Sequence, residues 1–153
     1  MKIRTDFVTN SSSSSFILGF SSEDVISEEL IEDFTGDRFE TLKDDCLKAE
    51  KLNLEEMLEY IKEHIKWNTR WELLDEVEKS GEIPYDEIYQ WEKTEAFKKR
   101  LDEEIDKRVK SMMTKAKDKN VFVVINYSDH TDSDLEHHIV PSMKSCLLRI
   151  SHH

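Results

Sequence analysis

The sequence predicts an α+β fold: a small three- or four-stranded sheet from both chain ends, with a long antiparallel helical hairpin inserted between. Two observations predict this class. Only 3 glycines and 2 prolines occur in 153 residues, too few turn-forming residues for a fold of many short strands. Apolar runs typical of strands lie near the chain ends, whereas the middle repeats apolar residues at helical spacing. We expect one domain over residues 1–153.

Strands are expected at about 12–20, 121–127 and 145–150. The first contains Phe16–Phe20, a short apolar run that follows a run of serines. The second contains Val121–Ile125, which is apolar without interruption and therefore typical of a strand buried on both faces. The pattern leaves open whether the second and third strands are parallel, with 128–144 as a crossover, or antiparallel.

The helical arm is expected over about 22–117, and its longest helices follow two short ones. Asn53 and Glu56 have the spacing of a capping box, which predicts the start of a long helix, and Gly81 is its expected end. Pro84 opens a second long helix, which is expected to continue without a break to about residue 117. Because few residues join the two long helices, we expect them to pair as an antiparallel hairpin.

The formal net charge is −12, and most acidic residues lie at 22–92. This acidity argues against nucleic acid as a general partner, because phosphate-binding proteins normally carry clustered positive charge. No apolar run approaches the ~20 residues that span a bilayer, and no apolar stretch of a signal peptide follows Lys2 and Arg4. We therefore expect a cytoplasmic protein without a membrane partner. Six basic residues of the second long helix are expected to face the acidic helices: Lys98, Lys99, Arg100, Lys107, Arg108 and Lys110.

The first residues of the chain form an unusual motif, MKIRTDFVTNSSSSSF. They resemble the opening of a recurrent set of small uncharacterised bacterial and phage proteins, whose first residues read Met-Lys-x-Arg-x-x-Phe-Val-Ser/Thr-Asn, then a serine run and Phe. The matching positions are Met1, Lys2, Arg4, Phe7, Val8, Thr9, Asn10, Ser11 to Ser15 and Phe16. The resemblance implies a bacterial or phage origin and brings no particular activity.

The serine run, Ser11 to Ser15, has three interpretations. The serines form a strand with small side chains packed under another element, a loop whose backbone receives an anion, or an acceptor site for modification. Phenylalanine on both sides, at Phe7 and Phe16, favours an ordered segment. The lack of glycine in the run argues against a phosphate-binding loop.

A cluster of histidines and carboxylates near the C-terminus is the candidate metal site. Five of the six histidines lie in the last 24 residues of the chain: His130, His137, His138, His152 and His153. The predicted ligands are Asp129, His130, Asp134, His137 and His138, residue types that suit zinc or manganese. If Ser133 caps a short helix through about Val140, Asp134 shares one face with His137 and His138. His152 and His153 join them only if the second and third strands are parallel.

Simpler interpretations explain the same residues without a metal. Ser133 and Glu136 have capping-box spacing, and Asp134 suits the first turn of a helix. The final two histidines are alternatively the remnant of a purification tag. Cys46 and Cys146 lack C-x-x-C spacing and are expected to be reduced, buried thiols rather than nucleophiles.

Two functions are compatible with these patterns, and they leave open whether the protein is an enzyme. The first is a protein-binding or regulatory module, in a phage context, that uses its acidic helical arm and needs no cofactor. Trp67, Trp71 and Trp91 are its candidate anchors, although aromatic residues at helical spacing are more often core. The alternative is a small metal-dependent hydrolase at the C-terminal cluster, with metal-bound water as nucleophile and a carboxylate as base. Burial of all three tryptophans would argue against the first.

Overall fold

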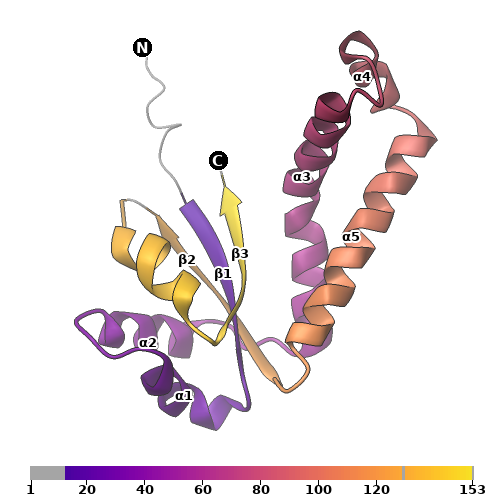
Figure 1. Ribbon diagram of the computed structural model, residues 1–153. Coiled ribbons are helices and arrows are strands. Elements are labelled where there is room, and N and C mark those ends of the chain that lie inside the picture. The colour runs from indigo at the N-terminus through magenta and orange to yellow at the C-terminus, as the bar shows by residue number, and fades with distance from the viewer. Residues whose placement is uncertain (1–12, 129, 153) are drawn as a thin grey trace. The chain divides into compact units, whose positions relative to one another are not determined.

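The computed structural model describes residues 13–128 and 130–152, so the motif at Met1–Asn10 lies outside the described residues (Figure 1). The predicted α+β class is confirmed, with a three-stranded antiparallel sheet from both chain ends and helices between. The elements are β1 (Ser13–Phe20), η2 (Glu23–Val25), α1 (Ile26–Asp33), α2 (Phe39–Lys48), α3 (Leu54–Ser80), α4 (Tyr85–Trp91), α5 (Glu95–Lys115), β2 (Val121–Ser128), η3 (Leu135–Ile139), η4 (Val140–Ser142) and β3 (Cys146–His152). None of the helices among these residues is long and apolar enough to cross a membrane.

The chain forms two compact units, which we call the sheet unit and the arm. The sheet unit combines the residues up to Met57 with those from Lys115 onward, and the arm is Leu58–Thr114. The arm is therefore shorter than the 22–117 expected from the sequence. The reason is that α1 and α2 bury their apolar faces in the core of the sheet unit. An amphipathic pattern shows which face of a helix is buried but not what covers it.

The sheet has the strand order β2-β1-β3, and β1 is antiparallel to both neighbours. Ser13, at the start of β1, lies opposite Ser128 at the end of β2 and opposite His152 at the end of β3. The strands β2 and β3 therefore run in the same direction on either side of β1. This settles the question that the sequence leaves open: the second and third strands are parallel, although they are not neighbours.

The central strand β1 positions the core. All its residues from Ser14 to Phe20 are buried. The core cluster comprises Phe16, Leu18, Phe20, Ile26, Leu30, Leu42, Cys46, Val123, Ile125, Tyr127, Leu135, Val140 and Met143. Gly19 allows a close approach, because a Cβ at this position would lie 2.9 Å from Leu147 Cδ1. For the described serines, burial of Ser14 and Ser15 favours the interpretation as a packed strand.

The first long helix of the arm begins and ends where the sequence predicts. The Glu56 N–H donates to Asn53 Oδ1 at 2.8 Å, and the Asn53 N–H donates to Glu56 Oε1 at 2.9 Å, so the capping box is confirmed. The helix ends at Ser80, before Gly81 with its φ of 75°.

The prediction of one continuous helix from Pro84 to about residue 117 is wrong. The chain leaves the helix after Trp91 and begins α5 at Glu95. Thr94 causes the break, because its Oγ1 donates to the Trp91 carbonyl at 2.6 Å and accepts from the Phe97 N–H at 3.3 Å. The threonine side chain thus replaces two backbone hydrogen bonds of a continuous helix and caps the next one.

The helices α3 and α5 pair as the expected antiparallel hairpin, with α4 at the connecting end (Figure 1). Arg108 contacts Glu72 at 2.8 Å, and Arg100 contacts Glu82, farther along the chain, at 2.7 Å. Buried apolar side chains of both helices lie in this unit: Ile61, Ile65, Leu73, Leu74, Val77, Phe97, Leu101, Ile105 and Met112. Of the six basic residues expected to face the acidic helices, Arg100 and Arg108 do so, whereas Lys98, Lys99, Lys107 and Lys110 are exposed.

Candidate functional site

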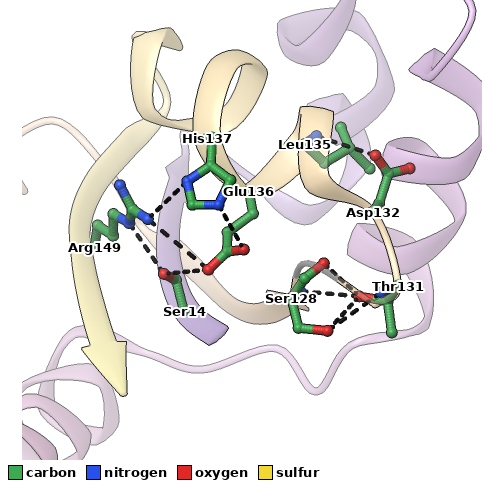
Figure 2. Close-up of polar contacts among 8 residues, drawn as sticks. All are labelled: Ser14, Ser128, Thr131, Asp132, Leu135, Glu136, His137 and Arg149. Carbon is green, nitrogen blue, oxygen red and sulfur yellow. Dashed lines mark hydrogen bonds and ion pairs between the residues drawn. The ribbon is translucent and has the colours of Figure 1, made fainter. Parts of the chain in front are cut away.

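Within residues 13–128 and 130–152, two places are candidate functional sites, and the first is a buried polar cluster in the sheet unit. We call it the Glu136 cluster; it contains Ser14, Glu136, His137 and Arg149 (Figure 2). The Glu136 carboxylate is fully buried. Its Oε2 accepts from Ser14 Oγ at 3.0 Å and lies 3.8 Å from Arg149 Nη2, and its Oε1 lies 3.1 Å from His137 Nε2. These contacts compensate the cost of burying a charge.

The remaining contacts close the Glu136 cluster on itself. Arg149 Nε donates to Ser14 Oγ at 3.0 Å, so the hydroxyl both accepts and donates a hydrogen bond. Arg149 Nη2 also lies 3.5 Å from His137 Nδ1. Because Ser14 is fully buried, its hydroxyl is not positioned to attack a substrate. The cluster instead joins η3 to the two strands β1 and β3.

The sequence-based role of Glu136 in a capping box is wrong. The Leu135 N–H donates to Asp132 Oδ1 at 3.1 Å, so Asp132 rather than Ser133 provides the acceptor at the start of this turn (Figure 2). Asp132 also pairs with Arg38 at 3.1 Å. The Glu136 side chain points toward the sheet instead of back to the start of the turn, and its carboxylate contacts Arg149 on β3. The turn itself, η3, is a π-helix.

Four of the five predicted metal ligands lie within the described residues. His130, Asp134 and His138 are exposed, and His137 belongs to the Glu136 cluster. His152 lies at the same end of the sheet as the end of β2, but its Nε2 lies 2.8 Å from Ser15 Oγ. In the described ranges, no three histidine, cysteine, aspartate or glutamate side chains are grouped to hold a metal ion. Asp129 and His153 lie outside those ranges, so a zinc or manganese site stays a prediction.

Neither cysteine is disposed for nucleophilic chemistry. Cys46 and Cys146 are free thiols, and Cys46 is buried in the core. Burial raises the pKa of the Cys46 thiol to about 12 and that of Cys146 to about 11. Both are therefore protonated at neutral pH and are poor nucleophiles.

The second place is a cleft in the arm with aromatic walls, which we call the aromatic cleft. It has a volume of about 570 Å³, and its apolar lining consists of Trp71, Leu74, Tyr85, Ile88 and Tyr89. Trp71 is 50% exposed, Tyr85 78% and Tyr89 64%. Such exposure of three large aromatic side chains around one cleft is unusual for residues that only support a core.

Local sequence explains how α4 presents its tyrosines. Pro84 precedes the helix, and Tyr85 and Tyr89 lie four positions apart, on one face. The end of α4 is fixed by an ion pair between Arg70 on α3 and Glu92, which follows α4. Trp91 packs edge-on against Phe97 at 5.1 Å between ring centroids, so this third tryptophan is partly buried against the arm and is not part of the cleft lining.

Four carboxylates complete the lining of the aromatic cleft: Asp75, Glu78, Asp86 and Glu92. Among the residues that the structure describes, no lysine or arginine lines the cleft. Glu92 is paired with Arg70, and Asp75 lies 3.0 Å from Lys79 Nζ. Within the described residues, Glu78 and Asp86 form no ion pair, so the cleft carries negative charge that the arm does not neutralise.

The aromatic cleft was only partly visible in the sequence. Trp71 is one of the candidate anchors, but Tyr85 and Tyr89 are not among the predicted site residues. The four-residue spacing of these tyrosines shows that they share one face of a helix. It does not show whether that face is buried or exposed.

No family model matches this chain, and no similar curated protein or solved structure was found.

Proposed function

We propose that the protein is a protein-binding module and that the aromatic cleft receives a segment of the partner protein. The exposure of Trp71, Tyr85 and Tyr89 around one cleft is the observation that carries this proposal. Tyrosine and tryptophan are enriched at protein interfaces and dominate binding energy there. In the free chain, much of the apolar surface of these three side chains is in contact with water, and a bound partner would bury that surface.

An extended aromatic surface favours a polypeptide over a small molecule as the occupant. Trp67, one turn before Trp71 on α3, is 59% exposed, and the two rings contact edge-on at 5.6 Å between centroids. The aromatic surface thus continues along α3 beyond the cleft. A partner segment can cover both tryptophans, whereas a compact ligand would fill the cleft alone.

Capture and reconstitution test the proposal. The immobilised chain is exposed to a lysate of the organism that encodes it, in parallel with W71A/Y89A and with M113A, which removes an exposed apolar side chain outside the cleft. We expect a partner that wild type and M113A retain and that W71A/Y89A loses. The purified partner must then bind the purified chain with the same dependence on these residues. Equal binding to all three proteins would refute the proposal.

A further inference from the structure

The charges around the aromatic cleft identify the chemistry of its occupant. We infer that the partner segment is basic and inserts a lysine or arginine side chain along the cleft; this inference rests on the proposed binding function. Exposed aromatic residues alone would accept a partner segment of any charge, whereas this inference requires a positively charged one.

The lining is both apolar and acidic. Trp71, Leu74 and Ile88 provide apolar surface, while Glu78 and Asp86 provide carboxylates without an ion-pair partner among the described residues. Burying these two carboxylates under an uncharged segment would remove their water without replacing it, which is costly. A cation placed beside them offsets that cost, so the cleft discriminates in favour of positive charge.

Lysine and arginine side chains match both parts of this lining. Each has an aliphatic stem that covers apolar surface and a charged head that stays near polar groups. The aliphatic stem suits Trp71 and Leu74, and the head suits Glu78 or Asp86. A purely aliphatic side chain satisfies the first requirement only, and a compact cation satisfies the second only.

The arm already holds its own cations against the same aromatic rings. The Arg70 guanidinium lies 4.9 Å from the centroid of Trp71, and Lys93 Nζ lies 4.0 Å from that of Tyr89. These distances are within the range of favourable cation–π contact. Glu92 balances the charge of Arg70, and Lys93, a single charge, can offset only one of the two carboxylates Glu78 and Asp86. The cleft therefore keeps a net negative charge that attracts a further cation.

A set of matched peptides tests the inference. The probe is a fluorescent amphipathic peptide of leucine and lysine, compared with peptides in which glutamine or glutamate replaces every lysine. Their binding to the full chain is followed by anisotropy. We expect the lysine peptide to bind at least about tenfold more tightly than the glutamine peptide, with the glutamate peptide weakest.

Paired variants locate the charge effect. E78Q/D86N is expected to weaken binding of the lysine peptide about tenfold. E63Q/E103Q, which neutralises two exposed carboxylates outside the cleft, changes the net charge equally and is expected to leave binding unchanged. Equal weakening by both pairs would overturn the inference, because the attraction would then come from overall acidity.

Two further outcomes would also overturn it. If the glutamine peptide binds as tightly as the lysine peptide and Y85A/Y89A weakens both, the binding function stands but the requirement for a basic partner fails. If no peptide binds, the inference fails, and the proposed function is then judged by the capture experiment alone.

Discussion

The sheet unit and the arm differ in how many of their large aromatic side chains stay exposed. In the sheet unit, Phe16, Phe20 and Phe122 are fully buried. In the arm, Trp67, Trp71, Tyr85 and Tyr89 are half exposed or more. The sheet unit also exposes single aliphatic side chains, such as Ile31 and Leu47, but the arm alone keeps four large aromatic side chains of the described residues exposed, which its own packing does not use. We therefore expect stability to depend mainly on buried residues of the sheet unit and binding on the exposed aromatic residues of the arm.

The largest effect is expected in the core of the sheet unit. Phe16→Ala removes a fully buried ring from the central strand and should lower the free energy of unfolding by about 4 kcal/mol. Urea unfolding followed by circular dichroism measures this change. A loss below about 1 kcal/mol would show that β1 is not the centre of the core.

The next largest effect is expected in the Glu136 cluster. Glu136→Ala leaves Arg149 and His137 without their buried partner and should cost about 3 kcal/mol. Asp86→Asn in the arm is the control, because that carboxylate is exposed and should change stability by less than about 0.5 kcal/mol. Equal effects of both changes in the same urea assay would contradict a structural role for the cluster.

Alkaline pH should destabilise the sheet unit through its thiols. The pKa of Cys46 is raised to about 12 and that of Cys146 to about 11, from an ordinary value near 9. Above pH 9 the unfolded state releases these protons before the folded state does, so stability falls as pH rises. By pH 10 the expected loss is about 1.4 kcal/mol per thiol.

Burial and the hydrogen bond to Asp45 also raise the pKa of Tyr127, which adds to this trend at higher pH. Urea midpoints measured from pH 7 to pH 10.5 give the slope. C46A/C146A should have a flatter profile above pH 9, and an unchanged slope in this variant would assign the effect to other groups.

A smaller effect is expected at the break between α4 and α5. Thr94→Ala removes the side chain that caps α5 and should cost about 1 kcal/mol. Thr114→Ala near the end of α5 is the matched control. Tryptophan fluorescence is the appropriate readout, because Trp67, Trp71 and Trp91 all lie in the arm. Identical unfolding of the two variants would contradict the capping role of Thr94.

The smallest effect on stability is expected at the aromatic cleft. Tyr89→Ala removes a side chain that is mostly in water, so the free energy of unfolding should change by less than about 0.5 kcal/mol. The same change should weaken binding of the lysine peptide. A loss of several kcal/mol in stability would instead show that Tyr89 belongs to the core of the arm.

Much of the fold was predictable because local signals determine it. Asn53 and Glu56 cap each other whatever surrounds them, and Gly81 takes a left-handed conformation that other residues avoid. The β2 strand could be predicted because its run of apolar residues is too short for a buried helix and is bounded by polar residues. Such features depend on nearby residues only.

Two kinds of error occurred, one local and one that depends on distant residues. Thr94 breaks the helix through hydrogen bonds to Trp91 and Phe97, three positions away on either side, and no glycine or proline marks the place. Glu136 has capping-box spacing, but its partners Ser14 and Arg149 lie on β1 and β3. The tryptophan spacing on α3 is the same whether the face is buried or exposed. For Glu136 and the tryptophans of α3, the tertiary environment rather than the local pattern decides the role.

The separation of binding from folding is tested most directly by nuclear magnetic resonance of the chain labelled with ¹⁵N. On adding the lysine peptide, we predict that the Trp71 indole signal and the amides of Tyr85 and Tyr89 shift most, while amides of the sheet unit, such as Phe16 and Leu18, stay in place. Shifts centred on the sheet unit, or a Trp71 signal that does not respond to a bound peptide, would contradict the assignment of binding to the aromatic cleft.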